Sequence, residues 1–160
     1  MRNTISKGFE HGFLYGLAGV NKRRSRKQVL KSIVDESASS IDMAKGLQGR
    51  GDWHGAAAKI VNAASLLGQA IDLAETLPGV EFSKTRKQTE LVIKRLGDAS
   101  AVLDSDTLKS REIISACEDA LQKAVDVLGL FSDSLNDDVL TKDSAAITFN
   151  ENALISKLKK

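Results

Sequence analysis

Hydrophobic residues recur at intervals of three and four positions along most of the chain, which is the spacing of one face of an α-helix. Turn and capping residues interrupt the pattern and divide it into helices expected over residues 28–49, 52–77, 83–103 and 107–135. A short helix is also expected over residues 152–160, whose lysines suit a helix C-terminus. No long segment alternates with a period of two, so the pattern disfavours strands.

The second of these helices has the widest apolar face, and small residues dominate it. One row of apolar positions steps by four and three throughout, and a second row lies beside it. Such a face favours a central helix with close neighbours on two sides. The two rows comprise Ala56, Ile60, Ala63, Leu67, Ala70, Ala74 and Leu77, and then Ala57, Val61, Ala64 and Ile71.

Only a few residues separate the four long helices, and short connections place consecutive helices antiparallel. The sequence therefore predicts an all-α fold, an antiparallel up-down four-helix bundle. We divide the chain into a basic, glycine-notched N-terminal segment (residues 1–27), the helical bundle (28–135) and an acidic linker with a short C-terminal helix (136–160).

Composition agrees with this architecture and limits the compartment. The chain of 160 residues is 42% hydrophobic and 4% aromatic, and its one proline leaves long helices uninterrupted. A single cysteine cannot form an intrachain disulfide, which favours the cytoplasm. The longest apolar run, residues 13–20, is far shorter than the roughly 20 residues of a membrane span. We therefore expect a cytoplasmic protein, with membrane association left open.

The N-terminal segment differs from the rest of the chain in charge. Residues 1–32 hold eight Lys or Arg and one acidic residue, a net charge of +7, whereas the whole chain carries +2. Its glycines recur every fourth position at Gly8, Gly12 and Gly16, so they share one edge of a helix and let another backbone approach closely. We expect apolar contacts from Phe9, Phe13, Leu14 and Leu17, and electrostatic attraction from Arg23, Arg24, Arg26 and Lys27.

Several explanations of this segment remain open. The glycine edge suits tight packing against a partner helix or a second copy of the chain, and a cationic block beside apolar residues also suits an anionic membrane surface. A solvated arm, an arm folded onto its own bundle, or a mitochondrial presequence would share the same composition. Aromatic residues do not interleave with the basic run, and the remaining chain is acidic, which disfavours dedicated nucleic-acid recognition.

Motifs for catalysis are missing from the sequence. His11 and His54 are the only histidines and lie far along the chain from Cys117, which falls on the apolar face of the fourth helix. No zinc spacing, calcium loop, phosphate loop or dinucleotide fingerprint is present. We therefore predict no catalytic residues, no metal, no cofactor and no small-molecule substrate.

Trp53, at the start of the second helix, more often packs over the end of a core than anchors a partner. The sequence as a whole favours a non-enzymatic interaction module, an adaptor or assembly subunit that docks its N-terminal segment on a partner helix or an anionic membrane surface. The alternatives are a homo-oligomeric structural protein assembled through the glycine edge, and a weak nucleic-acid-binding module.

Overall fold

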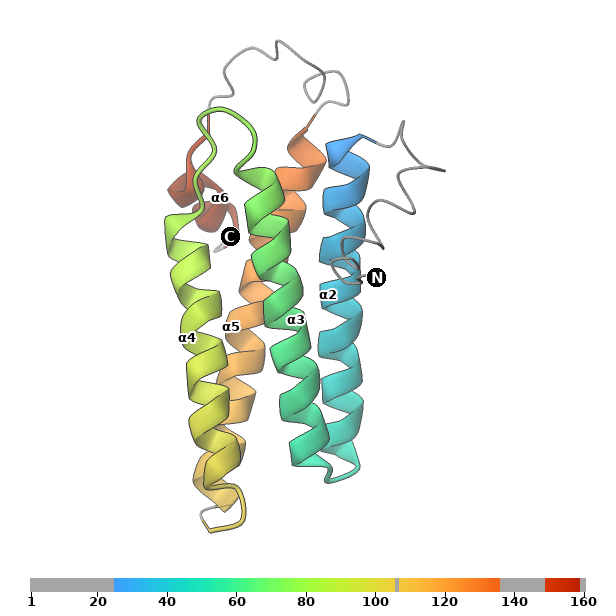
Figure 1. Ribbon diagram of the computed structural model, residues 1–160, viewed down its shortest axis with the longest axis vertical. Helices are drawn as coiled ribbons and strands as arrows, with labels where there is room; N and C mark the ends of the chain where they lie inside the picture. Colours follow the sequence, from blue (N-terminus) through green and yellow to red (C-terminus); the bar gives the residue numbers. More distant parts are fainter. Residues whose placement is uncertain (1–24, 106, 136–148, 159–160) are drawn as a thin grey trace, which may run out of the picture.

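The computed structural model describes residues 25–105, 107–135 and 149–158, and regular structure within these ranges is helical throughout. The expectation of an all-α fold is therefore confirmed. Four long helices lie side by side, and a short fifth one sits against one end of them (Figure 1). In chain order the helices are α2 (Arg26–Gly49), α3 (Trp53–Ala74), α4 (Ser83–Ala101), α5 (Thr107–Ser134) and α6 (Glu151–Lys157).

Local sequence explains where these helices begin and end. Ser25 and Gln28 form a capping box at the start of α2, in which each side chain accepts a hydrogen bond from the other residue's backbone N–H. Asp52 caps α3 by accepting a hydrogen bond from Gly55 N at 2.8 Å. Gly51 and Gly79 adopt φ values of 81° and 80° in the turns that follow α2 and α3, where glycine is favoured.

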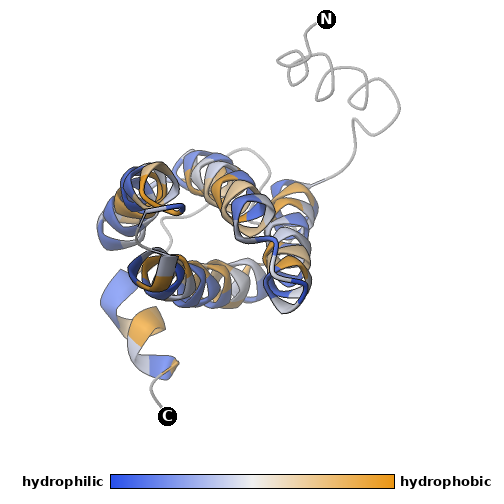
Figure 2. Cartoon of the chain, turned by 90° about the horizontal axis from the view of Figure 1, so that it is seen from below, coloured by the Kyte–Doolittle hydropathy of each residue, from blue (hydrophilic) through white to orange (hydrophobic). Residues whose placement is uncertain are grey.

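The helix α3 contacts α2, α4 and α5. Its buried face consists mainly of alanine, with two isoleucines and one leucine, so neighbouring backbones approach it closely. The wide alanine-rich stripe correctly predicts close neighbours for α3, but α3 is not uniquely central, because α5 also contacts all three other long helices. Viewed along their axes, the four long helices surround a common interior (Figure 2).

Hydroxyl groups link the helices inside this apolar core. Ser40 on α2 donates to the carbonyl oxygen of Lys59 on α3 at 2.9 Å and accepts from the amide of Asn62 at 3.1 Å. Ser110 on α5 donates to the carbonyl oxygen of Ala99 on α4 at 2.9 Å. Burying these polar atoms costs little because each has a hydrogen-bond partner.

The helices differ from their expected bounds by only a few residues. The first begins at Arg26 rather than Gln28, because Ser25 supplies the cap, and the second ends at Ala74 rather than Leu77. None of the described helices combines the length and the apolar composition needed to cross a membrane.

Candidate functional site

Most residues that the sequence predicts as a contact surface lie outside the described residues. These are Gly8, Phe9, Gly12, Phe13, Leu14, Gly16, Leu17, Arg23 and Arg24. The structure does place Arg26 and Lys27, which open α2 at the end of the molecule where α3 ends and α4 begins (Figure 1).

Arg26 and Lys27 have different environments. Arg26 is exposed, whereas Lys27 is half-buried and its ammonium donates to the carbonyl oxygen of Leu135 at 2.8 Å. A cation at this position complements the partial negative charge at the end of α5. Lys27 therefore joins the start of α2 to the end of α5, and Arg26 is the described basic residue that faces solvent at the start of α2.

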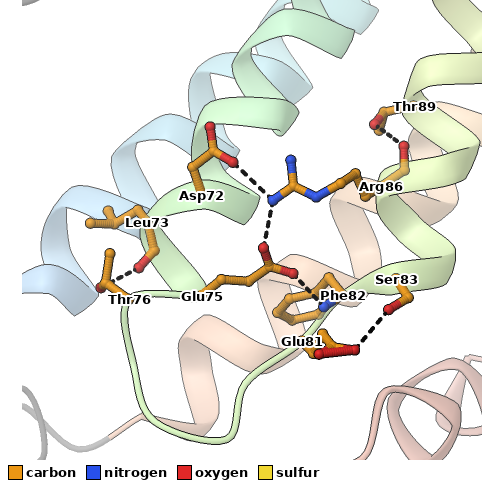
Figure 3. A network of polar contacts seen from close by, with 9 residues as sticks. All are labelled: Asp72, Leu73, Glu75, Thr76, Glu81, Phe82, Ser83, Arg86 and Thr89. Atoms are coloured by element: carbon orange, nitrogen blue, oxygen red, sulfur yellow. Dashed lines mark hydrogen bonds and ion pairs between the residues drawn. The ribbon is translucent and has the colours of Figure 1, made fainter.

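At the same end of the molecule, a polar network holds the turn between α3 and α4 (Figure 3). The Arg86 guanidinium pairs with Asp72 at 2.8 Å and Glu75 at 2.5 Å. These hydrogen bonds, the one to Asp72 foremost, raise the pKa of Arg86 above its ordinary value, so the side chain stays charged. Glu75 also accepts from Phe82 N at 2.8 Å, which fixes the residue before α4.

Beside this network, three phenylalanine rings from distant parts of the chain meet edge to face. Phe82 lies 5.2 Å from Phe131 on α5 and 4.8 Å from Phe149, and the last two rings are 5.5 Å apart between centroids. Such pairs add about 0.5–1.5 kcal/mol each beyond the area they bury. The cluster attaches residues 149–158, the C-terminal tail, to the bundle.

Glu151 of the C-terminal tail caps a helix to which it is not joined. Its carboxylate accepts hydrogen bonds from Lys84 N at 3.1 Å and from Thr85 N at 2.8 Å, both in the first turn of α4. It also accepts from the Thr85 hydroxyl at 2.6 Å, and Lys84 Nζ donates to Asn152 Oδ1 at 2.6 Å. A carboxylate here complements the free N–H groups and the positive end of the helix dipole.

At the opposite end of the molecule, Trp53 and His54 begin α3. Trp53 packs partly against the core, as its position predicts, and the Arg111 guanidinium lies 5.2 Å from its ring centroid. His54 lies 3.6 Å from Asp104, and both side chains are exposed. Leu108, in the first turn of α5, is 74% exposed.

Cys117 is buried on α5, in agreement with its place on the apolar face. Burial raises the pKa of the thiol, an effect partly offset by the positive charge of Arg95. The neutral thiol form is therefore favoured, which makes Cys117 a poor nucleophile. Within the part of the chain that the structure describes, no three His, Cys, Asp or Glu side chains are grouped to hold a metal ion.

Sequence patterns did not identify the contact between Glu151 and α4. The sequence offers one local signal: Asn150 is an N-cap residue, and an aromatic residue, Phe149, and a carboxylate, Glu151, stand on either side of it. Comparison of the chain with protein-family models, curated proteins and solved structures produced no match.

Proposed function

We propose that this chain is a non-enzymatic interaction module, in which an antiparallel up-down four-helix bundle carries the basic N-terminal segment to its binding partner. The observation that carries the proposal is the separation of charge along the chain. Residues 1–32 have a net charge of +7 and residues 33–160 a net charge of −5. Such separation attracts an anionic surface to one end of a molecule while the remainder repels it.

The described start of α2 supports this proposal. The basic run 22–27 leads directly into a helix whose first turn has a capping box and whose Leu30 is buried in the core. Lys27 adds a bond to the end of α5. A segment joined to such a fixed helix holds its partner close to the bundle, as an adaptor or assembly subunit requires. The partner is a protein helix or an anionic membrane face.

Vesicle co-sedimentation of the full chain tests whether the partner is an anionic membrane face. We expect binding to vesicles containing anionic lipid and little binding to neutral ones. Replacing Arg23, Arg24 and Arg26 with glutamine weakens binding by about a hundredfold, given about 1 kcal/mol for each basic residue near the surface. Lys27 is left unchanged because its ammonium donates a hydrogen bond to the carbonyl oxygen of Leu135. The matched control replaces three exposed lysines elsewhere, Lys87, Lys94 and Lys123, and keeps most of the binding.

Two results would contradict membrane binding by the N-terminal segment. Equal losses in the triple variant and its control would show that net charge, rather than the N-terminal segment, drives binding. Absence of binding by the full chain would exclude the membrane face, and the proposal would then rest on a protein helix. Replacing Phe9, Phe13 and Leu17 with serine tests the apolar contacts in either case, since they serve both partners.

The glycine edge favours a second candidate, a homo-oligomeric structural protein. Gly8, Gly12 and Gly16 would allow close contact between the same segments of two copies. Replacing all three with leucine blocks that approach, so the mass measured by light scattering should fall to that of one chain. A mass that does not change would exclude this candidate.

A further inference from the structure

The C-terminal tail binds the bundle through a small set of specific contacts. Phe149 packs against both Phe82 and Phe131, Glu151 accepts three hydrogen bonds from the first turn of α4, and Leu154 is buried at 9% exposure. An aromatic anchor, a carboxylate on a helix N-terminus and one apolar residue are how a short peptide is recognised by a preformed surface.

The tail depends on this surface for its order. The helix α6 has seven residues, and isolated helices shorter than about 12 residues are marginal in water. The surface that receives it belongs to the long helices and their turn: Glu75 holds Phe82 through its backbone N–H, and Phe131 is buried in the last turn of α5. We call this surface, made of Phe82, Lys84, Thr85 and Phe131, the tail-binding surface.

We propose that residues 149–154 are a displaceable internal ligand, and that a second copy of this chain supplies the same segment to the tail-binding surface, so that two copies exchange tails. The second copy carries the identical sequence, and therefore the same ring, carboxylate and leucine in the same spacing. Exchange of an identical element is a low-cost route to a dimer. The tail is joined to α5 only through residues 136–148, so no described helix has to break when it leaves.

In the unaltered chain, the tail-binding surface is occupied more readily by the tail of the same molecule than by the tail of a second copy. A binding segment tethered to its own surface by a short linker acts at an effective concentration of about millimolar. Exchange therefore becomes visible when the internal tail is weakened or when the protein is concentrated. This proposal uses no residue of the N-terminal segment, so its failure and the failure of the proposed function are separate results.

A labelled peptide with the sequence of residues 146–160 tests the surface. The receiver is the full chain carrying Phe149→Ala and Glu151→Gln, which weakens the internal tail; Glu151→Gln alone serves if the double variant unfolds. We expect the peptide to bind this receiver at least about tenfold more tightly than it binds the unaltered chain, whose surface is occupied. The control peptide carries the same two substitutions. Equal binding of both peptides, or none of either, would overturn the proposal.

A complementary pair of full-length variants tests the second copy directly. One variant keeps its tail but carries Lys84→Glu and Thr85→Val, which repel Glu151 and remove a hydroxyl donor. The other keeps the surface but carries Phe149→Ala and Glu151→Gln. Mixing them should raise the mass by one chain of 17.2 kDa in sedimentation, above either variant alone. A mixture with no such rise, even where the peptide binds, would exclude the second copy as occupant.

Discussion

At the scale of single residues, Ser132 stands out among the buried side chains of α5. It is 1% exposed, and its hydroxyl has no hydrogen-bond partner among the residues that the structure describes. An unsatisfied buried polar group costs about 1–3 kcal/mol, and alanine also has the higher helix propensity. We therefore expect Ser132→Ala to raise the free energy of unfolding by about 1 kcal/mol, measured by chemical denaturation.

Ser110, on the same helix, provides the matched control. Its equally buried hydroxyl donates to the carbonyl oxygen of Ala99. Ser110→Ala should therefore lower the free energy of unfolding by about 1 kcal/mol. If both substitutions changed stability in the same direction, the bonding state of the two hydroxyls would not explain their effects.

Cys117 makes the stability of the fold depend on pH in the alkaline range. Burial raises the pKa of its thiol in the folded chain, whereas an unfolded thiol titrates at about 8.5. Below that pH both states hold the proton and stability is unaffected. As the pH rises above it, the unfolded state loses its proton first, so the free energy of unfolding falls between pH 7.5 and 9.5.

Denaturation of the Cys117→Ala variant isolates this contribution of the thiol. The variant is less stable at pH 7.5 because a small space is left in the core. Its free energy of unfolding should nevertheless fall less than that of the original chain between pH 7.5 and 9.5. Parallel curves for the two proteins would show that the thiol does not titrate differently on unfolding.

The sequence predicts the environment of some residues and misses others for a physical reason. Helical spacing places Cys117 in the core, and the start of a helix places Trp53 over its end, because both depend on near neighbours in the chain. Sequence patterns do not single out Arg86, because its ion pairs need Asp72 and Glu75, which the turn between α3 and α4 brings beside it. The hydrogen bonds of Glu151 depend on the start of α4, where Thr85 is 66 residues away in the chain.

At the scale of the helices, glycines on α3 and α4 have opposite roles. A Cβ on Gly55 would lie 2.4 Å from Asp52 Oδ2, the carboxylate that caps α3, whereas a Cβ on Gly97 would meet open space. Alanine is favoured over glycine in a helix by about 1 kcal/mol. We expect Gly97→Ala to raise the free energy of unfolding by about 1 kcal/mol. Gly55→Ala should lower it, because the added Cβ displaces the capping carboxylate of Asp52.

Thermal unfolding followed by circular dichroism compares these two variants with Asp52→Ala. If the clash is with the cap, Gly55→Ala in the Asp52→Ala background should cause no further loss. A gain in stability from Gly55→Ala in the original chain would show that the cap moves aside at no cost.

Helix bounds were predictable because capping and breaking residues act within one turn. Asp52, Gly51 and Pro78 mark breaks in the sequence that the structure keeps, to within a few residues. The sequence pattern places the start of α2 two residues late, because the capping box begins at Ser25, inside the basic run, where the apolar pattern has not yet begun. Hydrophobic spacing detects a helix only after its first buried residue, here Leu30.

At the scale of the whole molecule, stability is expected to be uneven. The four long helices share one core, whereas α6 contributes one buried residue, Leu154, and is held by Phe149 and Glu151. Elements with few buried contacts open at free energies well below that of global unfolding. Amides of α6 should therefore exchange with solvent through a local opening, while those of α3 exchange only when the bundle unfolds.

Native-state hydrogen exchange of the full chain measures both openings in one experiment. Glu151→Gln weakens the charge-assisted bonds to α4, so it should speed exchange in α6 by about tenfold and leave the α3 amides unchanged. Asp126→Asn, which alters an exposed carboxylate on α5, is the control and should affect neither helix. Equal opening free energies for α6 and α3 would mean that the tail leaves only when the fold is lost. In that case it would be a fixed part of the core, and no second copy would find the tail-binding surface free.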